Sequence, residues 1–173
     1  MIKRWGIELH PLKSNHLELL RTWRNSDFVR NTMQFQEYIS ESSQLVWFDS
    51  LGISNSRYFM IYNGSEFVGC CNIKNIDQRT LIGEGGVFLG ESRFQKSLDA
   101  VKAVFLMYHW SFMKKGLQGA ICEVLLDNSR ATKLNKMLGF SMEVHDDGIL
   151  RGSLTQLDFM KAYAKYNRVL SAS

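Results

Sequence analysis

The segment from Ser97 to Lys114 is apolar on almost every side when it is read as an α-helix. Such a helix has to be buried, because a surface helix keeps a polar face toward water. The chain can cover it, since 45% of its 173 residues are hydrophobic and 22% are charged. This composition excludes a disordered chain, and the length fits one domain. The residues that carry the pattern are Leu98, Val101, Val104, Phe105, Tyr108 and Phe112.

Three segments before this helix are typical of antiparallel strands. Arg57 to Tyr62 is aromatic and apolar, and Asn63-Gly64 after it is a strong hairpin-turn signal. We expect the next two strands over Glu66 to Ile76 and Leu81 to Leu89, with a turn at Asp77 to Thr80 between them. The last strand carries three glycines, which favour a bulge or a close backbone approach.

The pattern before these strands is mostly helical. Asn15 and Ser40 are the expected N-caps, because a short polar side chain can accept a hydrogen bond from the first turn. The expected elements are a strand of about six residues that contains Ile7 and Leu9 and ends at Pro11, a helix at Asn15–Arg24, a short helix at Phe28–Thr32 and a helix at Ser40–Leu51.

Strands and a short helix are expected after the buried helix. Ala120 to Leu126 is almost continuously apolar and is therefore predicted to be a central strand. The remaining expected elements are a helix at Ser129–Met137 between Asn128 and Gly139, a strand at Phe140–Val144, a turn at Asp146–Gly148 and a last strand at Leu154–Tyr163. Helices and strands mixed around one sheet give an α/β or α+β class. We expect one domain over residues 1–165 and a loose C-terminal tail over 166–173.

The charge of the chain does not favour a nucleic-acid-binding protein. Twenty-one basic residues against 17 acidic ones give a net charge of +4, and the basic residues are spread along the chain. A nucleic-acid binder concentrates Lys and Arg in a patch or stripe. An anionic small-molecule partner remains compatible with this charge.

The three cysteines are expected to be free thiols, and we expect no metal site. Cys70 and Cys71 are adjacent, and no cysteine–histidine spacing fits zinc. The most apolar segment, Ala103 to Met113, is far shorter than the roughly 20 residues that a membrane span needs. No apolar stretch follows the first residues, so we expect no signal peptide and a cytoplasmic location.

The segment from Asn128 to Phe140 resembles the N-x-x-A…L-G-F signature of the GNAT superfamily of N-acetyltransferases. It follows an apolar strand and a long buried helix, as the order of elements in that family requires. The resemblance covers about Ile2 to Tyr163. It implies a mixed, mainly antiparallel central sheet flanked by helices, with a splayed pair of central strands, and acetyl-CoA as the acetyl donor.

Five short segments are similar to acetyltransferases that modify amino sugars on nucleotide carriers, such as those of the pseudaminic-acid pathway. They are Trp23-Arg24-Asn25, Tyr38-Ile39-Ser40, Trp47-Phe48, Asn75-Ile76-Asp77 and Cys122-Glu123-Val124-Leu125. The similarity implies that Trp23, Arg24 and Asn25 contact the acceptor, where an arginine beside an aromatic ring suits a diphosphate. The alternative is an ordinary helix end. Ribosomal-protein and polyamine acetyltransferases share much of this layout.

The same resemblance predicts where acetyl-CoA binds. The family uses R/Q-x-x-G-x-G/A before the buried helix, and Ser97 and Asp99 stand here in place of glycines. A helix N-terminus holds a pyrophosphate with its free N–H groups, and the alternative for this stretch is a plain capping turn. The predicted contacts are Arg93, Phe94, Gln95, Lys96, Ser97 and Leu98 in the loop, Val87, Phe88 and Leu89 on the preceding strand, and Asn128, Arg130 and Lys133 on the short helix.

Two residues are expected to act in the chemistry. The position of Glu84 often carries the general base in the family, and a carboxylate can take the proton that an ammonium must lose before it attacks. The alternative is a solvated glutamate, with Glu123 as the next candidate base or a salt-bridge partner. Asn135 stands seven residues after Asn128, where the family usually has a tyrosine as general acid. An amide can hydrogen-bond a thiolate or hold a water but cannot protonate it.

The sequence therefore predicts an acetyl-CoA-dependent N-acetyltransferase that acts on the primary amine of a small acceptor, in first place a nucleotide-linked amino sugar. Alternatives are acetylation of a protein N-terminus or a polyamine, and a non-catalytic binding protein. We expect a cleft between the strand at Glu84–Leu89 and the strand at Ala120–Leu126. A homodimer is compatible with the sequence.

Overall fold

A computed structural model describes residues 1–145 and 147–172. Within these residues eight strands form one sheet in the order β1-β2-β3-β4-β5-β6-β8-β7. All neighbouring strands pair antiparallel except β5 and β6, which are parallel. The mixed, mainly antiparallel sheet is the one expected. The strands are β1 (Ile2–Arg4), β2 (Ile7–Pro11), β3 (Arg57–Tyr62), β4 (Phe67–Lys74), β5 (Ile82–Leu89), β6 (Gly119–Leu125), β7 (Ser141–Val144) and β8 (Ile149–Thr155).

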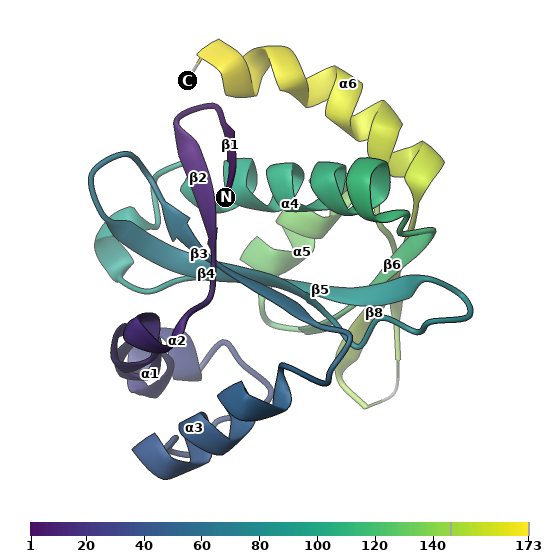
Figure 1. Ribbon diagram of the computed structural model, residues 1–173. Coiled ribbons are helices and arrows are strands. Elements are labelled where there is room, and N and C mark those ends of the chain that lie inside the picture. The colour runs from purple at the N-terminus through teal and green to yellow at the C-terminus, as the bar shows by residue number, and fades with distance from the viewer. Residues whose placement is uncertain (146, 173) are drawn as a thin grey trace.

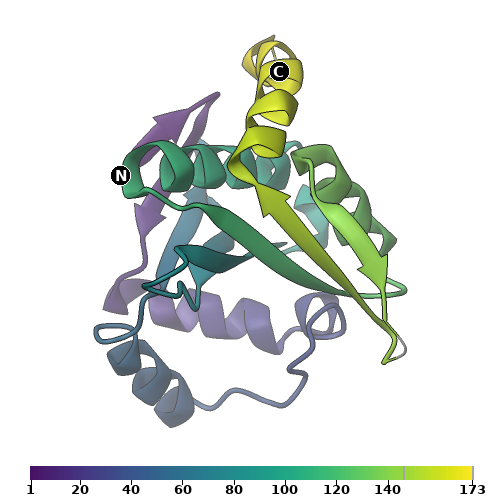
Figure 2. The ribbon, with the colours of Figure 1, turned by 90° about the vertical axis from the view of Figure 1, so that its right-hand side faces the viewer.

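Helices cover both faces of this sheet, as Figures 1 and 2 show. On one face α4 (Asp99–Lys115) packs on strands β1 to β5, and α6 (Gln156–Ala172) packs on α4 and on α5 (Ser129–Leu138). On the other face lie α1 (Leu17–Asn25), α2 (Asp27–Arg30) and α3 (Glu41–Ser50). Two short 3-10 helices, η1 (Ser14–His16) and η2 (Ser92–Phe94), precede α1 and α4.

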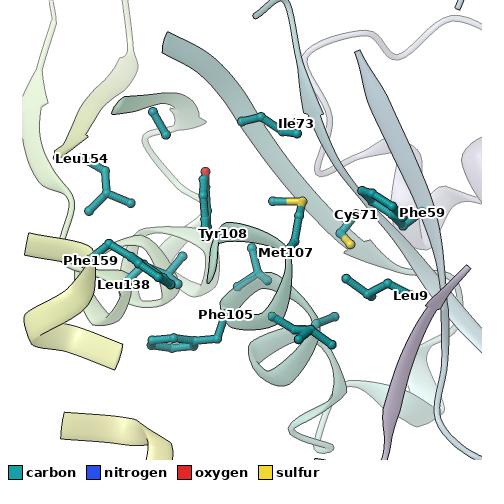
Figure 3. Close-up of a cluster of buried hydrophobic side chains, with 14 of the residues drawn as sticks. Leu9, Phe59, Cys71, Ile73, Phe105, Met107, Tyr108, Leu138, Leu154 and Phe159 are labelled. Carbon is teal, nitrogen blue, oxygen red and sulfur yellow. The ribbon is translucent and has the colours of Figure 1, made fainter. Parts of the chain in front are cut away.

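The hydrophobic core has two parts, one on each face of the sheet. The larger apolar cluster lies between the sheet and α4, where Phe105, Met107 and Tyr108 meet side chains of the strands and Phe159 of α6 (Figure 3). The smaller cluster joins α1 and α2 to the opposite face of β3 and β4 through Trp23, Met60 and Cys70 and their neighbours. The segment that is apolar all round is therefore buried between sheet and α6, as predicted.

The N-terminal region differs from the expected elements in two places. Strand β1 was not expected, and a tight turn at Trp5 and Gly6, both at positive φ, pairs it with β2. Asn15 does not cap α1, because Ser14–His16 forms a 3-10 turn in which the Lys13 N–H donates to Nδ1 of His16. Helix α1 therefore begins two residues later than predicted.

The C-terminal region corrects the last expected strand and the loose tail. Strand β8 ends at Thr155, and α6 then runs to Ala172. The Thr155 hydroxyl accepts the N–H of Asp158 at 3.1 Å and donates to its carboxylate at 2.7 Å, which starts a helix where a strand was predicted. The expected domain end at residue 165 falls inside α6. Asp146, expected in the preceding turn, and Ser173 lie outside the described residues.

All three cysteines are buried and free, as expected. Among the described residues no helix is long and apolar enough to cross a membrane.

Candidate active site

The parallel pair of central strands separates part-way along its length. Strands β5 and β6 pair at Ile82, Gly83 and Glu84, and in the described chain the ladder stops at the pair Glu84–Ile121. Beyond that point β5 keeps its pairing with β4 on the other edge. A cavity of about 580 Å³ opens there, lined by β3 to β6, by α4 and α5, and by the helices of the opposite face. The predicted cleft is confirmed.

Strand β5 presents free backbone groups to this cavity. The carbonyl of Leu81 accepts Gln118 N–H from the β6 side, and the carbonyl of Ile82 accepts Asp77 N–H from the β4 side. Alternate residues of a strand direct their backbone groups to opposite edges. The N–H groups of Val87 and Leu89 therefore face the open edge, where a ligand with carbonyl oxygens can pair with them.

Tyr108 of α4 closes the end of the cavity where the strands diverge. Its ring rises from the helix toward the sheet, with the hydroxyl at the far end (Figure 3). A Cβ at Gly85 would overlap this hydroxyl, so only glycine leaves room for it. Burial raises the pKa of Tyr108, with smaller contributions from nearby Cys122 and Glu84. The phenol therefore stays protonated at neutral pH.

Glu84 lies on β5 next to Gly85. Its side chain faces the side of the sheet opposite to α4 and Tyr108. Its side chain is 26% exposed, and Nζ of Lys74 lies 2.8 Å from one carboxylate oxygen. Nδ2 of Asn75 donates to the other oxygen at 3.2 Å. The carboxylate is thus held in place at the cavity wall while part of it remains open to water.

Glu123 of β6 ties the opposite rim to the loop that follows α2. Its carboxylate accepts from Nε2 of Gln34 at 3.1 Å and from Nε of Arg151 at 3.0 Å. These bonds lower the pKa of Glu123. Gln34 and Arg151 stabilise the carboxylate form of Glu123. A carboxylate bound in this way is better suited to a structural contact than to accepting a proton as a base.

Arg24 lines the cavity from the end of α1. Its guanidinium carbon lies 6.0 Å from the centre of the Phe88 ring. Within the described chain no carboxylate lies within ion-pair distance of it. Burial lowers the pKa of Arg24, which reflects the cost of keeping this cation away from water. An anion in the cavity would lower that cost.

An aromatic pair stands beside Arg24. Trp47 of α3 meets the Tyr58 ring edge-on, with centroids 5.0 Å apart. Burial raises the pKa of Tyr58 to about 12. On the next strand Oδ1 of Asn72 is buried, lies among the cavity residues and finds no hydrogen-bond partner in the described chain. This wall therefore offers flat apolar surface and an unused acceptor.

Two of the four predicted residues at α5 line the cavity, and two do not. Asn128 caps the helix, since its Oδ1 accepts the Ala131 N–H at 3.0 Å. Asn135 lies about two turns further along on the same face, and both residues line the cavity. Arg130 and Lys133 are exposed on the outer side and do not line it.

The predicted phosphate loop lies outside this cavity. The guanidinium of Arg93 binds Glu66 at 2.6 Å and Glu91 at 2.8 Å and lies 4.2 Å from the Phe94 ring centre. These carboxylates raise the pKa of Arg93. Phe94 is part of the core, whereas Gln95, Lys96, Ser97 and Leu98 are exposed before α4. Oγ of Ser97 accepts the Asp99 N–H at 3.2 Å.

The other predicted acceptor residues have structural contacts. Trp23 is buried, and its indole fills the space that a Cβ at Gly90 would need. The side chain of Asn25 makes two hydrogen bonds with the backbone of Ile39, at 2.9 and 2.8 Å. These bonds fasten the loop that carries Gln34 to the end of α1. Neither side chain lines the cavity.

Sequence reasoning did not identify Tyr58, Asn72 and Tyr108 as cavity residues. Each is a polar group in an apolar stretch, and buried polar groups need partners. A polar residue in an apolar stretch can be noticed in the sequence. Which face of the sheet or helix it lies on follows only from the fold.

The comparisons with known proteins agree with this arrangement. A family model described as an acetyltransferase (GNAT) domain matches residues 7–141. No curated protein sequence matches the chain.

Three solved structures illustrate the shared fold. The structure titled apo FdhC, a nucleotide-linked sugar GNAT, has a TM-score of 0.82 at 19% identity, covering 98% of this chain and 97% of that one. Spermidine N-acetyltransferase from Vibrio cholerae, in complex with CoA and spermine, has a TM-score of 0.81 at 16% identity, covering 91% and 99%. The N-acetyltransferase PseH from Campylobacter jejuni has a TM-score of 0.66 at 18% identity, covering 87% and 99%. The chain belongs to the GNAT family and is an acetyl-CoA-dependent N-acetyltransferase.

Proposed function

We propose that this enzyme acetylates the primary amine of an acceptor that also carries an anionic group, and that the acceptor is a nucleotide-linked amino sugar. The observation that carries the proposal is the half-buried guanidinium of Arg24, which lines the cavity and has no carboxylate partner in the described chain.

The cavity fits acetyl-CoA at the open edge of β5. The free N–H groups of Val87 and Leu89 match the carbonyl oxygens of a pantetheine arm and of a thioester. Bound there, acetyl-CoA supplies an activated acetyl group. The exposed loop over Gln95–Leu98 and the start of α4 would meet its pyrophosphate. Arg93 would hold the shape of that loop, because two carboxylates already bind it.

The residues of the chain have three roles in this proposal. Glu84 takes a proton from the acceptor ammonium, directly or through a water, and Lys74 holds its carboxylate in place at the cavity wall. The N–H groups of Val87 and Leu89 stabilise the oxyanion that develops on the carbonyl oxygen. Asn135 donates a hydrogen bond to the departing sulfur.

The charges in the cavity favour an anionic acceptor over a polyamine. A polycation needs free carboxylates, but Glu84 is bound by Lys74 and Glu123 by Arg151. Arg24 is the cation left for a diphosphate, which it can bind through two parallel hydrogen bonds. The surface of Trp47 and Tyr58 can accept the ring of a sugar or a base.

The test measures CoA release with a nucleoside-diphosphate-linked amino sugar, the same amino sugar without its nucleotide, spermidine and a short peptide. We expect the nucleotide-linked acceptor to give the highest kcat/KM. Arg24→Gln should raise its KM by about tenfold or more, because a charge-assisted contact is lost.

Arg30→Gln is the matched control, since Arg30 lies on α2 close to Arg24 in sequence but is absent from the cavity wall. It should keep the wild-type KM. If spermidine is the preferred acceptor and Arg24→Gln leaves KM unchanged, the proposed acceptor is wrong. The cytoplasmic location and the homodimer stay predictions.

A further inference from the structure

A second cavity, of about 250 Å³, lies on the other face of the sheet. It is formed by strands β3 and β4, the connection that follows β4, and the C-terminal part of α4. Neighbouring residues of a strand point to opposite faces. Accordingly Arg57 and Ile73 line this cavity, whereas Tyr58 and Asn72 line the active-site cavity. The second cavity is therefore separate from the acetyl-transfer site.

A buried hydroxyl in this cavity has no partner. Ser111 of α4 is 1% exposed, and its Oγ makes no hydrogen bond within the described chain. A buried hydroxyl that is left unpaired destabilises the folded protein. A buried polar group without a protein partner leaves a hydrogen bond that a water or a bound ligand can supply.

Two cations stand at the same cavity. Arg57 and Lys115 both line it, and no carboxylate of the described residues forms an ion pair with either. Nη1 of Arg57 donates to the Ser56 carbonyl at 2.9 Å, and Nζ of Lys115 lies 5.3 Å from the centre of the Trp110 ring. Asp77, in the turn that follows β4, accepts hydrogen bonds from the N–H groups of Arg79 and Thr80.

The backbone at the end of α4 closes on itself. The carbonyl of Ser111 accepts the N–H groups of Gly116 and Leu117, which closes the helix. The lysines of the last turn offset the negative end of the helix dipole. Ile73, Trp110 and Leu117 supply apolar wall. Two further lining residues, Asn55 and Gln78, are polar, and Nε2 of Gln78 donates to Oδ1 of Asn55 at 3.2 Å.

We propose that this cavity binds a small organic anion with a flat apolar body. The apolar body lies between Ile73, Trp110 and Leu117. Its anionic group lies between Arg57 and Lys115, and a polar atom of the ligand pairs with the Ser111 hydroxyl. The cavity is smaller than the roughly 300–1,000 Å³ typical of sites for drug-sized ligands, so the occupant is a compact molecule.

The test uses indole-3-carboxylate as the probe, with indole and inorganic phosphate as partial probes. Binding is measured by titration calorimetry and by backbone amide shifts, without acetyl-CoA, so its outcome is independent of the proposed acceptor. We expect indole-3-carboxylate to shift the amides around Ile73 and Ser111. Indole and phosphate should each bind at least about tenfold more weakly, since each lacks half of the contacts.

Charge-removing variants test whether Arg57 and Lys115 bind the probe directly or only add to the net charge of the protein. Arg57→Gln and Lys115→Gln should each weaken binding about tenfold. Arg79→Gln and Lys114→Gln each remove one positive charge next to a lining residue, Gln78 and Lys115, without lining the cavity themselves, and should keep the wild-type affinity.

Ser111→Ala should change thermal stability and probe binding in opposite directions. Removing an unpaired buried hydroxyl should raise the Tm, while the same change weakens binding of the probe. The proposal is overturned if the probe does not bind at millimolar concentration, if Arg57→Gln and Lys115→Gln leave binding unchanged, or if Ser111→Ala binds the probe as the wild type does. Equal binding of phosphate alone would overturn the apolar part of the site.

Discussion

At the scale of single residues the proposed chemistry rests on Glu84. Lys74 and Asn75 hold both of its oxygens, and the strand that carries it opens directly afterwards. A base in this position can reach an acceptor amine only because β6 has turned away.

Glu84→Gln should lower the rate of acetyl transfer by about 10²- to 10⁴-fold, the usual contribution of a general base. The loss should be greatest at low pH, where fewer acceptor molecules are already free amines. Rates from pH 5 to 9 with a fixed acceptor measure this effect.

Glu143→Gln, on the exposed strand β7, is the control and should keep the wild-type profile. A Glu84→Gln enzyme that matches the wild type across the whole range would exclude Glu84 as the base and leave Glu123 to be tested.

Gly85 and Tyr108 form a pair that can be tested by itself. A Cβ at Gly85 would overlap the Tyr108 hydroxyl. Gly85→Ala should therefore destabilise the fold by about 1–3 kcal/mol, as overpacking of a core does. Tyr108→Phe removes the hydroxyl but leaves the ring carbon Cζ 2.6 Å from the added Cβ, so it should recover part of that loss in the double variant.

Urea unfolding of the four proteins gives the coupling energy directly. Additive effects of the two substitutions would contradict the contact. Gly86→Ala is the neighbouring control, because its Cβ would meet only the Asn72 side chain, at 3.1 Å.

At the scale of elements the predictions succeeded where a local signal was sufficient. Strand β3 has the predicted bounds, Ser40 caps α3, and Asn128 and Gly139 begin and end α5. Thr155 with Asp158 is an equally local signal for the start of α6, but the apolar residues of this segment favour a strand when they are read alone. Strand β1 has three residues and needs β2 and α6 beside it, so no local pattern predicts it.

The packing of α4 against α6 predicts a dependence on pH. His109 stacks on Tyr163 at a centroid distance of 4.4 Å. Burial lowers the pKa of His109, and the nearby charges of Arg4 and Lys114 lower it further. The unfolded chain therefore binds more protons than the folded protein below about pH 6.5, and the free energy of unfolding falls as the pH drops.

The comparison is the change in unfolding free energy between pH 7.5 and 5.5, measured by urea unfolding. His109→Gln should show a smaller fall than the wild type. A residual fall is expected, because burial also lowers the pKa of His16. A wild-type stability that rises on acidification in this range would contradict the burial of these rings.

At the scale of the whole molecule the family could be predicted from the sequence, but the walls of the cavity could not. The spacing from Asn128 to Phe140 predicted the family and the diverging strands. The contact of Gln34 with Glu123 joins residues 89 apart in sequence, and no spacing indicates it. Nor does any spacing indicate that Trp23 packs in the core and that Asn25 binds the backbone of Ile39.

The most direct test of the account is the titration of acetyl-CoA, because every proposed step requires that the open edge of β5 binds it. At 100 times its Kd, a ligand that binds only the folded protein stabilises it by about 2.7 kcal/mol. We predict saturable binding by calorimetry and a matching rise in Tm. Ala131→Trp should remove both effects by filling the cavity, whereas Lys136→Trp, on the exposed side of α5, should keep them. A folded wild-type protein that shows neither binding heat nor a shift in Tm at millimolar acetyl-CoA would contradict the account.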